Sequence, residues 1–193
     1  MRIVGGAWRG RRLAAPADGG TRPTSDRARQ ALFDMLMHAP WAGRAVIEDA
    51  HVLDAFAGTG ALGLEALSRG AARATFFEQD RAALRVLRAN VAACGAEACC
   101  TVREGDALLP PRAAGDAGCG VVFLDPPYGL GLVPLAVAAL GAKGWMLPEA
   151  LVVAEMGRAE AAPADGSLLA ERVYGAARIC VWRMGGQRER RCR

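Results

Sequence analysis

The chain has 193 residues, a formal net charge of +4 and an apolar composition of 52%, which is enough to build the core of one α/β domain. Residues 1–6 turn polar too early for a signal peptide, and no run approaches the roughly 18 apolar residues of a membrane span. Six cysteines without a C-x-x-C pair and only two histidines exclude a clustered zinc site and indicate a metal-free protein of the reducing cytoplasm.

The positive charge is concentrated at the two ends. Residues 1–29 carry seven arginines against two aspartates, and residues 183–193 carry five arginines against one glutamate. Because the whole chain is only +4, the part between them is acidic. Basic ends on an acidic body indicate an anionic partner such as nucleic acid. For the C-terminal end, a solvated and disordered tail is the alternative.

The predicted elements begin with a small β-hairpin over residues 2–13 and a helix over residues 25–37, capped by Ser25 or Asp26. From residue 51 onward, short apolar runs alternate with helical periods. Strands are expected at 51–56, 74–78, 99–103, 120–125 and 151–155, and helices at 61–68, 80–94 and 132–142. This alternation predicts right-handed βαβ units and a parallel sheet covered on both faces.

Two β-rich runs, 167–174 and 177–184, are joined around Gly175 and predict a closing antiparallel hairpin. We therefore expect an α/β fold of the class I, Rossmann-like methyltransferase type. Its mostly parallel seven-stranded sheet ends in an antiparallel hairpin and carries a small N-terminal hairpin and helix extension. The predicted organisation is an N-terminal hairpin and helix extension at 1–40, an α/β domain of this type at 41–184 and a basic tail at 185–193.

A glycine-rich loop follows the first predicted strand. The spacing Gly58-x-Gly60-x-x-Gly63 lets the backbone approach a nucleotide-like ligand closely, but it suits a nicotinamide dinucleotide as well as S-adenosylmethionine. Asp54 at the strand end favours S-adenosylmethionine, because a carboxylate binds the amino group of a methionine moiety and repels a pyrophosphate.

Other predicted cofactor contacts follow the next two strands. Glu78 is expected to accept hydrogen bonds from both ribose hydroxyls, and Asp106 to accept one from the adenine amino group. Phe56, Gly58, Gly60 and Ala107 complete the predicted cofactor site.

The second motif is Asp125-Pro126-Pro127-Tyr128, directly after an apolar strand. An amine conjugated to a base ring is a poor nucleophile, because its lone pair is delocalised. The Asp125 carboxylate and the Pro126 carbonyl can hold such an amine so that the lone pair points at a methyl donor. Tyr128 offers a face on which an extruded base can stack. These three residues are the predicted catalytic group, and no covalent intermediate is needed.

The whole chain to about residue 184 resembles the RsmD family of 16S ribosomal RNA (guanine-N2)-methyltransferases. The resemblance lies in residues 2–11, 22–33, 54–70 and 125–128. It implies a cytoplasmic enzyme whose partner is 16S rRNA in the 30S subunit or a late assembly intermediate, with a monomer as the default state. By position it implies that Arg9, Arg11, Arg22 and Arg27 meet RNA phosphates. Gln30 and the arginine-rich tail depart from the family pattern.

Other functions remain possible from the motifs. DNA adenine-N6 and protein glutamine methyltransferases carry a similar acid-Pro-Pro motif, but they add a domain for which this chain has no room. A non-catalytic ribosome assembly factor would not need Glu78 and Asp125. A nicotinamide dehydrogenase is disfavoured by Asp54 and by the residues 125–128.

Overall fold

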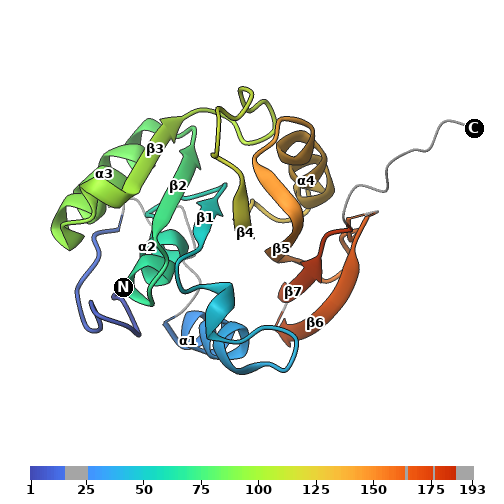
Figure 1. The fold of residues 1–193 in the computed structure, drawn as a ribbon, viewed down its shortest axis with the longest axis horizontal. Helices are drawn as coiled ribbons and strands as arrows, with labels where there is room; N and C mark the ends of the chain where they lie inside the picture. Colours follow the sequence, from blue (N-terminus) through green and yellow to red (C-terminus); the bar gives the residue numbers. More distant parts are fainter. Residues whose placement is uncertain (16–25, 164, 176, 186–193) are drawn as a thin grey trace, which may run out of the picture.

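The computed structural model describes residues 1–15, 26–163, 165–175 and 177–185. A seven-stranded sheet in the order β3-β2-β1-β4-β5-β7-β6 forms the centre of the molecule (Figure 1). The strands are β1 (His51–Asp54), β2 (Arg73–Glu78), β3 (Cys100–Glu104), β4 (Cys119–Leu124), β5 (Met146–Gly157), β6 (Ser167–Tyr174) and β7 (Ala177–Arg183). Strands β1 to β5 pair in parallel, while β7 runs antiparallel to β5 and β6. The predicted sheet with its closing antiparallel hairpin is confirmed.

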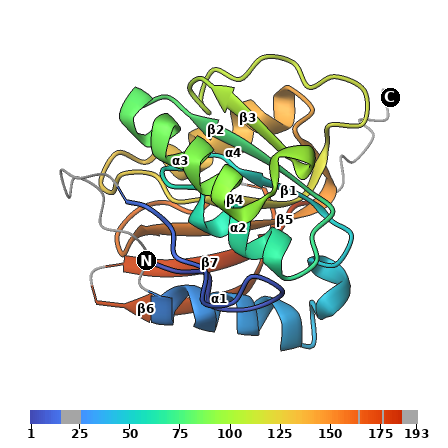
Figure 2. The same cartoon turned by 90° about the vertical axis from the view of Figure 1, so that its left-hand side faces the viewer.

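Helices cover both faces of this sheet (Figure 2). They are α1 (Asp26–His38), α2 (Ala61–Ser68), α3 (Arg81–Cys94) and α4 (Leu132–Ala142), with short 3₁₀ turns at Arg44–Val46 and Glu97–Cys99. Successive strand side chains point to opposite faces, so Phe76 packs in the cluster under α1, α2 and α3, and Phe77 in the cluster under α4. The sheet is therefore buried on both sides, as its apolar strands predict.

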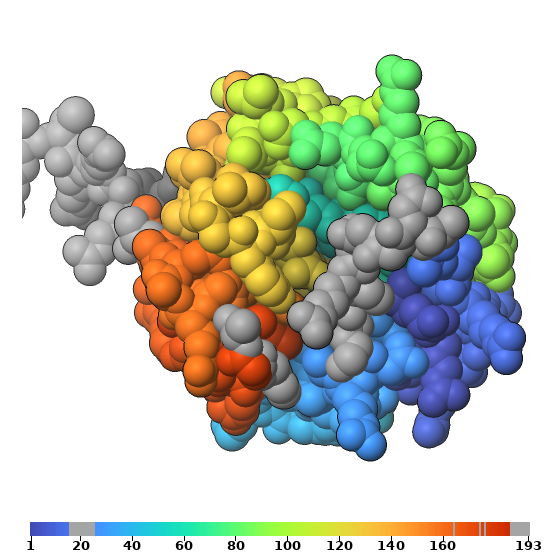
Figure 3. Space-filling model, turned by 180° about the vertical axis from the view of Figure 1, so that it is seen from behind, coloured from blue at the N-terminus to red at the C-terminus, as the bar shows by residue number. Residues whose placement is uncertain are grey.

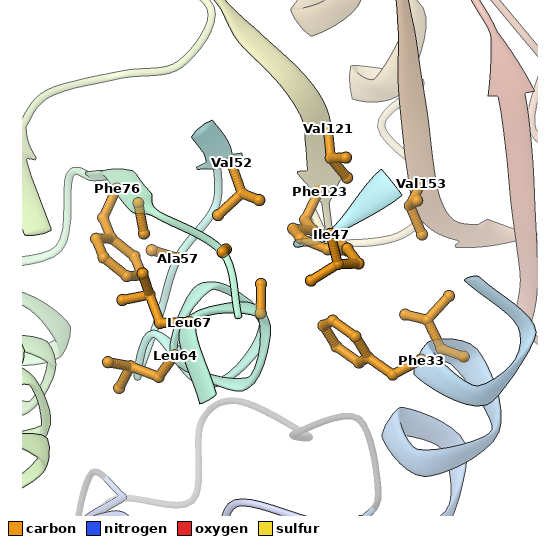
Figure 4. Packing of buried hydrophobic residues seen from close by; sticks show 14 of the residues in the cluster. Phe33, Ile47, Val52, Ala57, Leu64, Leu67, Phe76, Val121, Phe123 and Val153 are labelled. Atoms are coloured by element: carbon orange, nitrogen blue, oxygen red, sulfur yellow. The ribbon is translucent and has the colours of Figure 1, made fainter. Parts of the chain in front are cut away.

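Helix α1 belongs to the same core as the sheet. Figure 4 shows Phe33 of α1 directed toward Phe123 of β4, and their ring centroids are 5.6 Å apart. Leu32 and Leu36 of α1 are also buried in this cluster. The N-terminal extension thus shares its core with the sheet. Asp26 begins α1, whereas Ser25, the alternative cap, lies outside the described residues.

Residues 1–15, the N-terminal arm, fold back on themselves and dock on the end of α2. The predicted hairpin is present only as one isolated antiparallel bridge between Arg2 and Arg12. The Ala7 amide donates to the Ser68 carbonyl at 2.7 Å. Gly6 has a φ of 73°, and a Cβ there would lie 1.8 Å from that carbonyl oxygen. The arm needs glycine at this point, because any side chain would push it off the helix.

Two strands, β1 and β5, differ from the prediction by more than one residue at a bound. Strand β1 ends at Asp54, because the chain then turns into the glycine-rich loop. Strand β5 begins at Met146, five residues before the predicted 151, and Cys119 pairs with Met146 across a register shift. Pro148 and Glu149 interrupt the apolar pattern, and Glu149 has a φ of 60°. For this reason the sequence does not predict the first residues of the strand.

Candidate active site

A cavity of about 440 Å³ opens where strands β1, β2, β3 and β4 end. The chain leaves β1 toward β2 on one side and returns to β4 on the other, and such switch points are where α/β sheets bind ligands. Figure 3 shows the segment after β1 recessed between α3 and the segment after β4. The volume falls within the roughly 300–1,000 Å³ of ligand pockets. Nine predicted site residues line the cavity: Asp54, Phe56, Gly58, Glu78, Asp106, Ala107, Asp125, Pro126 and Tyr128.

Asp54 is the most deeply buried acid of the cavity, with 1% of its surface exposed. Its Oδ2 accepts a hydrogen bond of 3.0 Å from the Gly63 amide in the first turn of α2. Burial raises the pKa of Asp54 to about 7; the bond from Gly63 opposes this rise, and the nearby charge of Glu78 adds to it. A cationic ligand group beside Asp54 would favour the ionised form.

Gly60 is the one predicted cofactor residue that does not line the cavity. It is the N-cap of α2, with a φ of 79°, and a Cβ there would lie 2.3 Å from Leu87 Cδ1 of α3. Its place in the structure is therefore that of the tight turn between β1 and α2, next to the cavity.

Glu78 at the end of β2 holds the wall of the cavity together. Its Oε2 accepts from the Gly58 amide at 2.7 Å, and its Oε1 accepts from the Asp80 amide at 2.8 Å. Asp106 binds its own loop in the same way, since its Oδ1 accepts from the Leu108 amide at 2.8 Å. Each carboxylate oxygen has a second lone pair. Both acids can therefore shape the loops and still accept from a ligand.

The residues 125–128 form the wall opposite β2. Pro126 is buried, Asp125 is half-buried, and Tyr128 is 47% exposed at the rim. The Tyr128 hydroxyl donates to Oε1 of Glu155 on β5. Asp125 and Pro126 thus lie in the wall of the cavity, while Tyr128 is exposed at its rim.

Glu160 is a residue of this site that sequence reasoning missed. Its Oε1 accepts from the amides of Gly129 and Gly131, each at 3.0 Å, and its Oε2 accepts from the Gly157 amide at 2.5 Å. Burial raises the pKa of the Glu160 carboxyl, but the backbone hydrogen bonds outweigh this effect and the net shift is downward. The carboxylate therefore ties the loop after Tyr128 to the end of β5.

We expect Glu160→Ala to lower kcat about ten- to hundredfold, because displacement of a catalytic loop by about 1 Å can cost that much. Glu160→Gln keeps one oxygen that can accept from Gly129 and Gly131 and should recover part of the rate. The measurement is kcat alongside the dissociation constant of the cofactor. Asp116→Ala, which removes an exposed pair with Arg73, is the control, and an equal loss there would contradict a specific loop effect.

A buried arginine also lines the cavity. Arg29 of α1 is 0% exposed; its Nη2 lies 2.9 Å from Asp26 Oδ1, and its Nε lies 3.6 Å from Glu65 Oε2. The same guanidinium donates to the Arg2 carbonyl. In the sequence Arg29 counts toward the basic end that meets an anionic partner. The structure corrects this, because its charge is neutralised inside the protein.

Three of the four predicted RNA-binding arginines are described, and none of the three lines the cavity. Arg9, Arg11 and Arg27 are exposed, while Arg22 lies outside the described residues, as does most of the predicted basic tail. Arg11 also donates to the Ala93 carbonyl at the end of α3, at 2.6 Å. Among the residues that the structure describes, no three His, Cys, Asp or Glu side chains converge to hold a metal ion, and no helix is long and apolar enough to cross a membrane.

The family described as "Conserved hypothetical protein 95" matches residues 1–183. The protein named "Ribosomal RNA small subunit methyltransferase D" of Escherichia coli strain K12 is 42% identical over 184 residues, which cover 91% of this chain and 85% of that protein. The chain belongs to the RsmD family. The resemblance seen in the sequence is confirmed.

Solved structures agree with membership of the RsmD family. The Escherichia coli protein yhhF has a TM-score of 0.82 at 40% identity, with 97% of this chain and 99% of that one covered. An RNA methyltransferase from Salinibacter ruber, solved with S-adenosyl-L-homocysteine, has a TM-score of 0.62 at 17% identity, with 84% and 94% covered. At that identity the second likeness shows the fold alone.

Proposed function

We propose that this RsmD-family protein transfers a methyl group from S-adenosylmethionine to the exocyclic N2 amino group of a guanine in 16S rRNA of the small ribosomal subunit. The observation that carries the proposal is one cavity at the switch point that joins Asp54, Glu78 and Asp106 to the residues 125–128. The E. coli relative carries the name of a small-subunit rRNA methyltransferase. The proposed substrate is a 30S subunit or its late assembly intermediate. The reaction would therefore take place in the cytoplasm, and the protein would act as a monomer.

The cavity fits the cofactor in size and in the chemistry of its acids. Three carboxylates lie at or just after the ends of β1, β2 and β3. Each suits a different hydrogen-bond donor of the cofactor. Asp54 would hold the amino group of the methionine part, Glu78 the ribose hydroxyls and Asp106 the adenine amino group, with Phe56, Gly58 and Ala107 in contact. When bound, S-adenosylmethionine supplies a methyl group on a positively charged sulfur.

The residues after β4 prepare the acceptor nitrogen. The Asp125 carboxylate and the Pro126 carbonyl each accept one amino hydrogen, so the nitrogen lone pair is turned toward the methyl group. Tyr128 stacks on the base once it leaves its neighbours, a contact worth about 1–3 kcal/mol. A nitrogen that has accepted the methyl group would carry one proton too many, and the Asp125 carboxylate would take that proton. Orientation therefore supplies most of the catalysis.

The pKa of Asp54 predicts a pH-dependent cofactor affinity. The folded chain keeps the Asp54 proton up to about pH 7, against 3.8 for the ordinary carboxyl. If the ionised form binds, affinity should rise about tenfold between pH 6 and pH 8 as that form becomes dominant. Calorimetric titration with S-adenosylmethionine measures this. Asp54→Asn should bind weakly with no such rise, whereas a wild-type affinity that is flat with pH would contradict the prediction.

The raised pKa of Asp54 also affects the stability of the ligand-free fold. This stability should fall as the pH rises, whereas the cofactor affinity should increase. Below pH 3.8 the carboxyl is protonated in both the folded and unfolded states. Its full contribution to the free energy of unfolding is then present. As the pH rises to about 7, only the unfolded chain gains by ionising, so this contribution is lost. The cofactor should therefore stabilise the fold more strongly above pH 7 than at pH 5.

Transfer of labelled methyl to unmethylated 30S subunits, naked 16S rRNA and DNA, followed by nucleoside analysis, tests the proposal. Label in N2-methylguanosine from 30S subunits is the expected result. Label in adenine or in protein would keep the chemistry and overturn the substrate. A chain that binds the cofactor and labels nothing would be a non-catalytic assembly factor.

A further inference from the structure

Helix α3 presents a stripe of positive charge to solvent. Its 14 residues include three arginines and no acidic residue. Arg81, Arg85 and Arg88 are all exposed, and their i, i+4 and i+7 spacing puts them on one side of the helix. Arg81 lies 3.5 Å from Glu104. Within the described part of the chain, Arg85 and Arg88 form no ion pair.

The stability of the helix does not account for this stripe. A positive side chain in the first turn opposes the helix dipole, which favours negative charge there. Like charges four residues apart, as in Arg81 and Arg85, also disfavour the helix. Asp80, the N-cap whose side chain accepts from the Ala83 amide at 2.7 Å, already supplies the stabilising contact. Because these arginines do not stabilise the helix, a binding partner outside the chain is the better explanation for them.

The stripe is continuous with the N-terminal arm. Figures 1 and 3 both show the arm beside α3. Asn90 accepts from the Ala14 amide at 2.7 Å and donates to the Ala14 carbonyl at 3.1 Å, so the arm is fixed against the last turns of α3. At the other end of the helix, Asp80 lines the cavity. Basic side chains thus extend from the cavity rim along α3 to the arm.

We propose that Arg85 and Arg88 of α3 bind the phosphate backbone of the substrate RNA, together with the arginines of the N-terminal arm. The inference rests on the proposed function and adds to it a surface on which the RNA runs. From Arg85 to Arg88 the helix rises about 4.5 Å, and the two long side chains that leave it can each reach a different phosphate of one RNA strand. Arginine suits this partner because its planar guanidinium binds phosphate oxygens in pairs.

The test is binding of the protein, loaded with S-adenosyl-L-homocysteine, to unmethylated 30S subunits at several KCl concentrations. The double variant Arg85→Gln/Arg88→Gln removes both charges and keeps good helix formers. Two lost phosphate contacts should flatten the slope of log K against log salt by about 1.4 and weaken binding roughly ten- to thirtyfold at 0.1 M salt. The affinity for S-adenosylmethionine should not change. The matched control is Arg44→Gln/Arg172→Gln, two exposed arginines before β1 and on β6.

Weaker binding with the flatter slope in the α3 variant alone would support the inference. Weaker binding with an unchanged slope would overturn it in favour of a ribosomal protein as the partner of this stripe. Binding equal to wild type, or an equal loss in the control, would also overturn it. The readout does not depend on turnover. Wild type that binds 30S subunits but does not label guanine would sink the proposed function alone.

Discussion

Asp125→Ala should reduce kcat by about 10²–10⁴-fold while cofactor affinity stays almost unchanged. In the proposed mechanism Asp125 contacts the acceptor amine, whereas Asp54, Glu78 and Asp106 of the same cavity would hold the cofactor from other strand ends. Loss of one positioned acceptor typically costs this much of the rate. Single-turnover methyl transfer and calorimetric titration with S-adenosylmethionine measure the two quantities separately.

Two further variants make this result specific. Asp125→Asn keeps an oxygen that can accept from the amine, so it should retain more activity than Asp125→Ala. Asp116→Ala removes an exposed acid that pairs with Arg73 at 3.2 Å, outside the cavity, and should behave as wild type. If Asp125→Ala lost cofactor binding as severely as it lost methyl transfer, Asp125 would be a cofactor residue and the mechanism would be wrong.

The largest effect on stability should come from Glu65→Ala. Glu65 is 0% exposed and lies beside two buried arginines: its Oε1 is 2.8 Å from Arg69 Nε, and its Oε2 is 3.6 Å from Arg29 Nε. It also accepts the amides of Val4 and Gly5, each at 2.8 Å. Removing one partner of a buried ion pair costs about 3–5 kcal/mol.

For a chain of this length, that loss corresponds to a fall in Tm of about 6–20 °C. Thermal unfolding followed by circular dichroism is the measurement. Glu48→Ala breaks the exposed pair with Arg44, at 3.4 Å, and should change stability by less than about 1 kcal/mol. Glu65→Gln, which keeps the volume and one acceptor oxygen, provides a folded variant if the alanine protein does not fold. Equal effects of Glu65→Ala and Glu48→Ala would refute the prediction.

The parts of the fold and site that the sequence predicts are those with local signals. Helices α2 and α4 begin and end where their periodicity predicts, and Asp80 caps α3 as expected. The cavity residues follow from the strands, because parallel strands bring their carboxyl ends to one edge. Asp54, Glu78 and Asp125 therefore meet although they are far apart in the chain.

The parts that it does not predict depend on distant partners. Glu160 stands in an Ala-, Gly- and Pro-rich loop, and two of the three amides from which it accepts lie 29 and 31 residues earlier. From the sequence alone, a carboxylate in such a loop cannot be distinguished from one that faces solvent. Arg29 has a helical spacing that suits either face, and its burial depends on Glu65 and the Arg2 carbonyl, which are distant in the sequence, as well as on Asp26. A sequence identifies the sign of each charged side chain, but it does not identify the group with which that side chain pairs.

The docking of the N-terminal arm has a consequence for the order of folding during synthesis. The arm is translated before α2, yet the amides of Val4 and Gly5 donate to Glu65 across 61 and 60 residues of chain. A contact of such long sequence separation must close a large loop, so it forms slowly and late. Until α2 has been translated, the arginines of the arm have no fixed place. The arm, which we propose binds RNA, thus leaves the ribosome before the helix that fixes its shape.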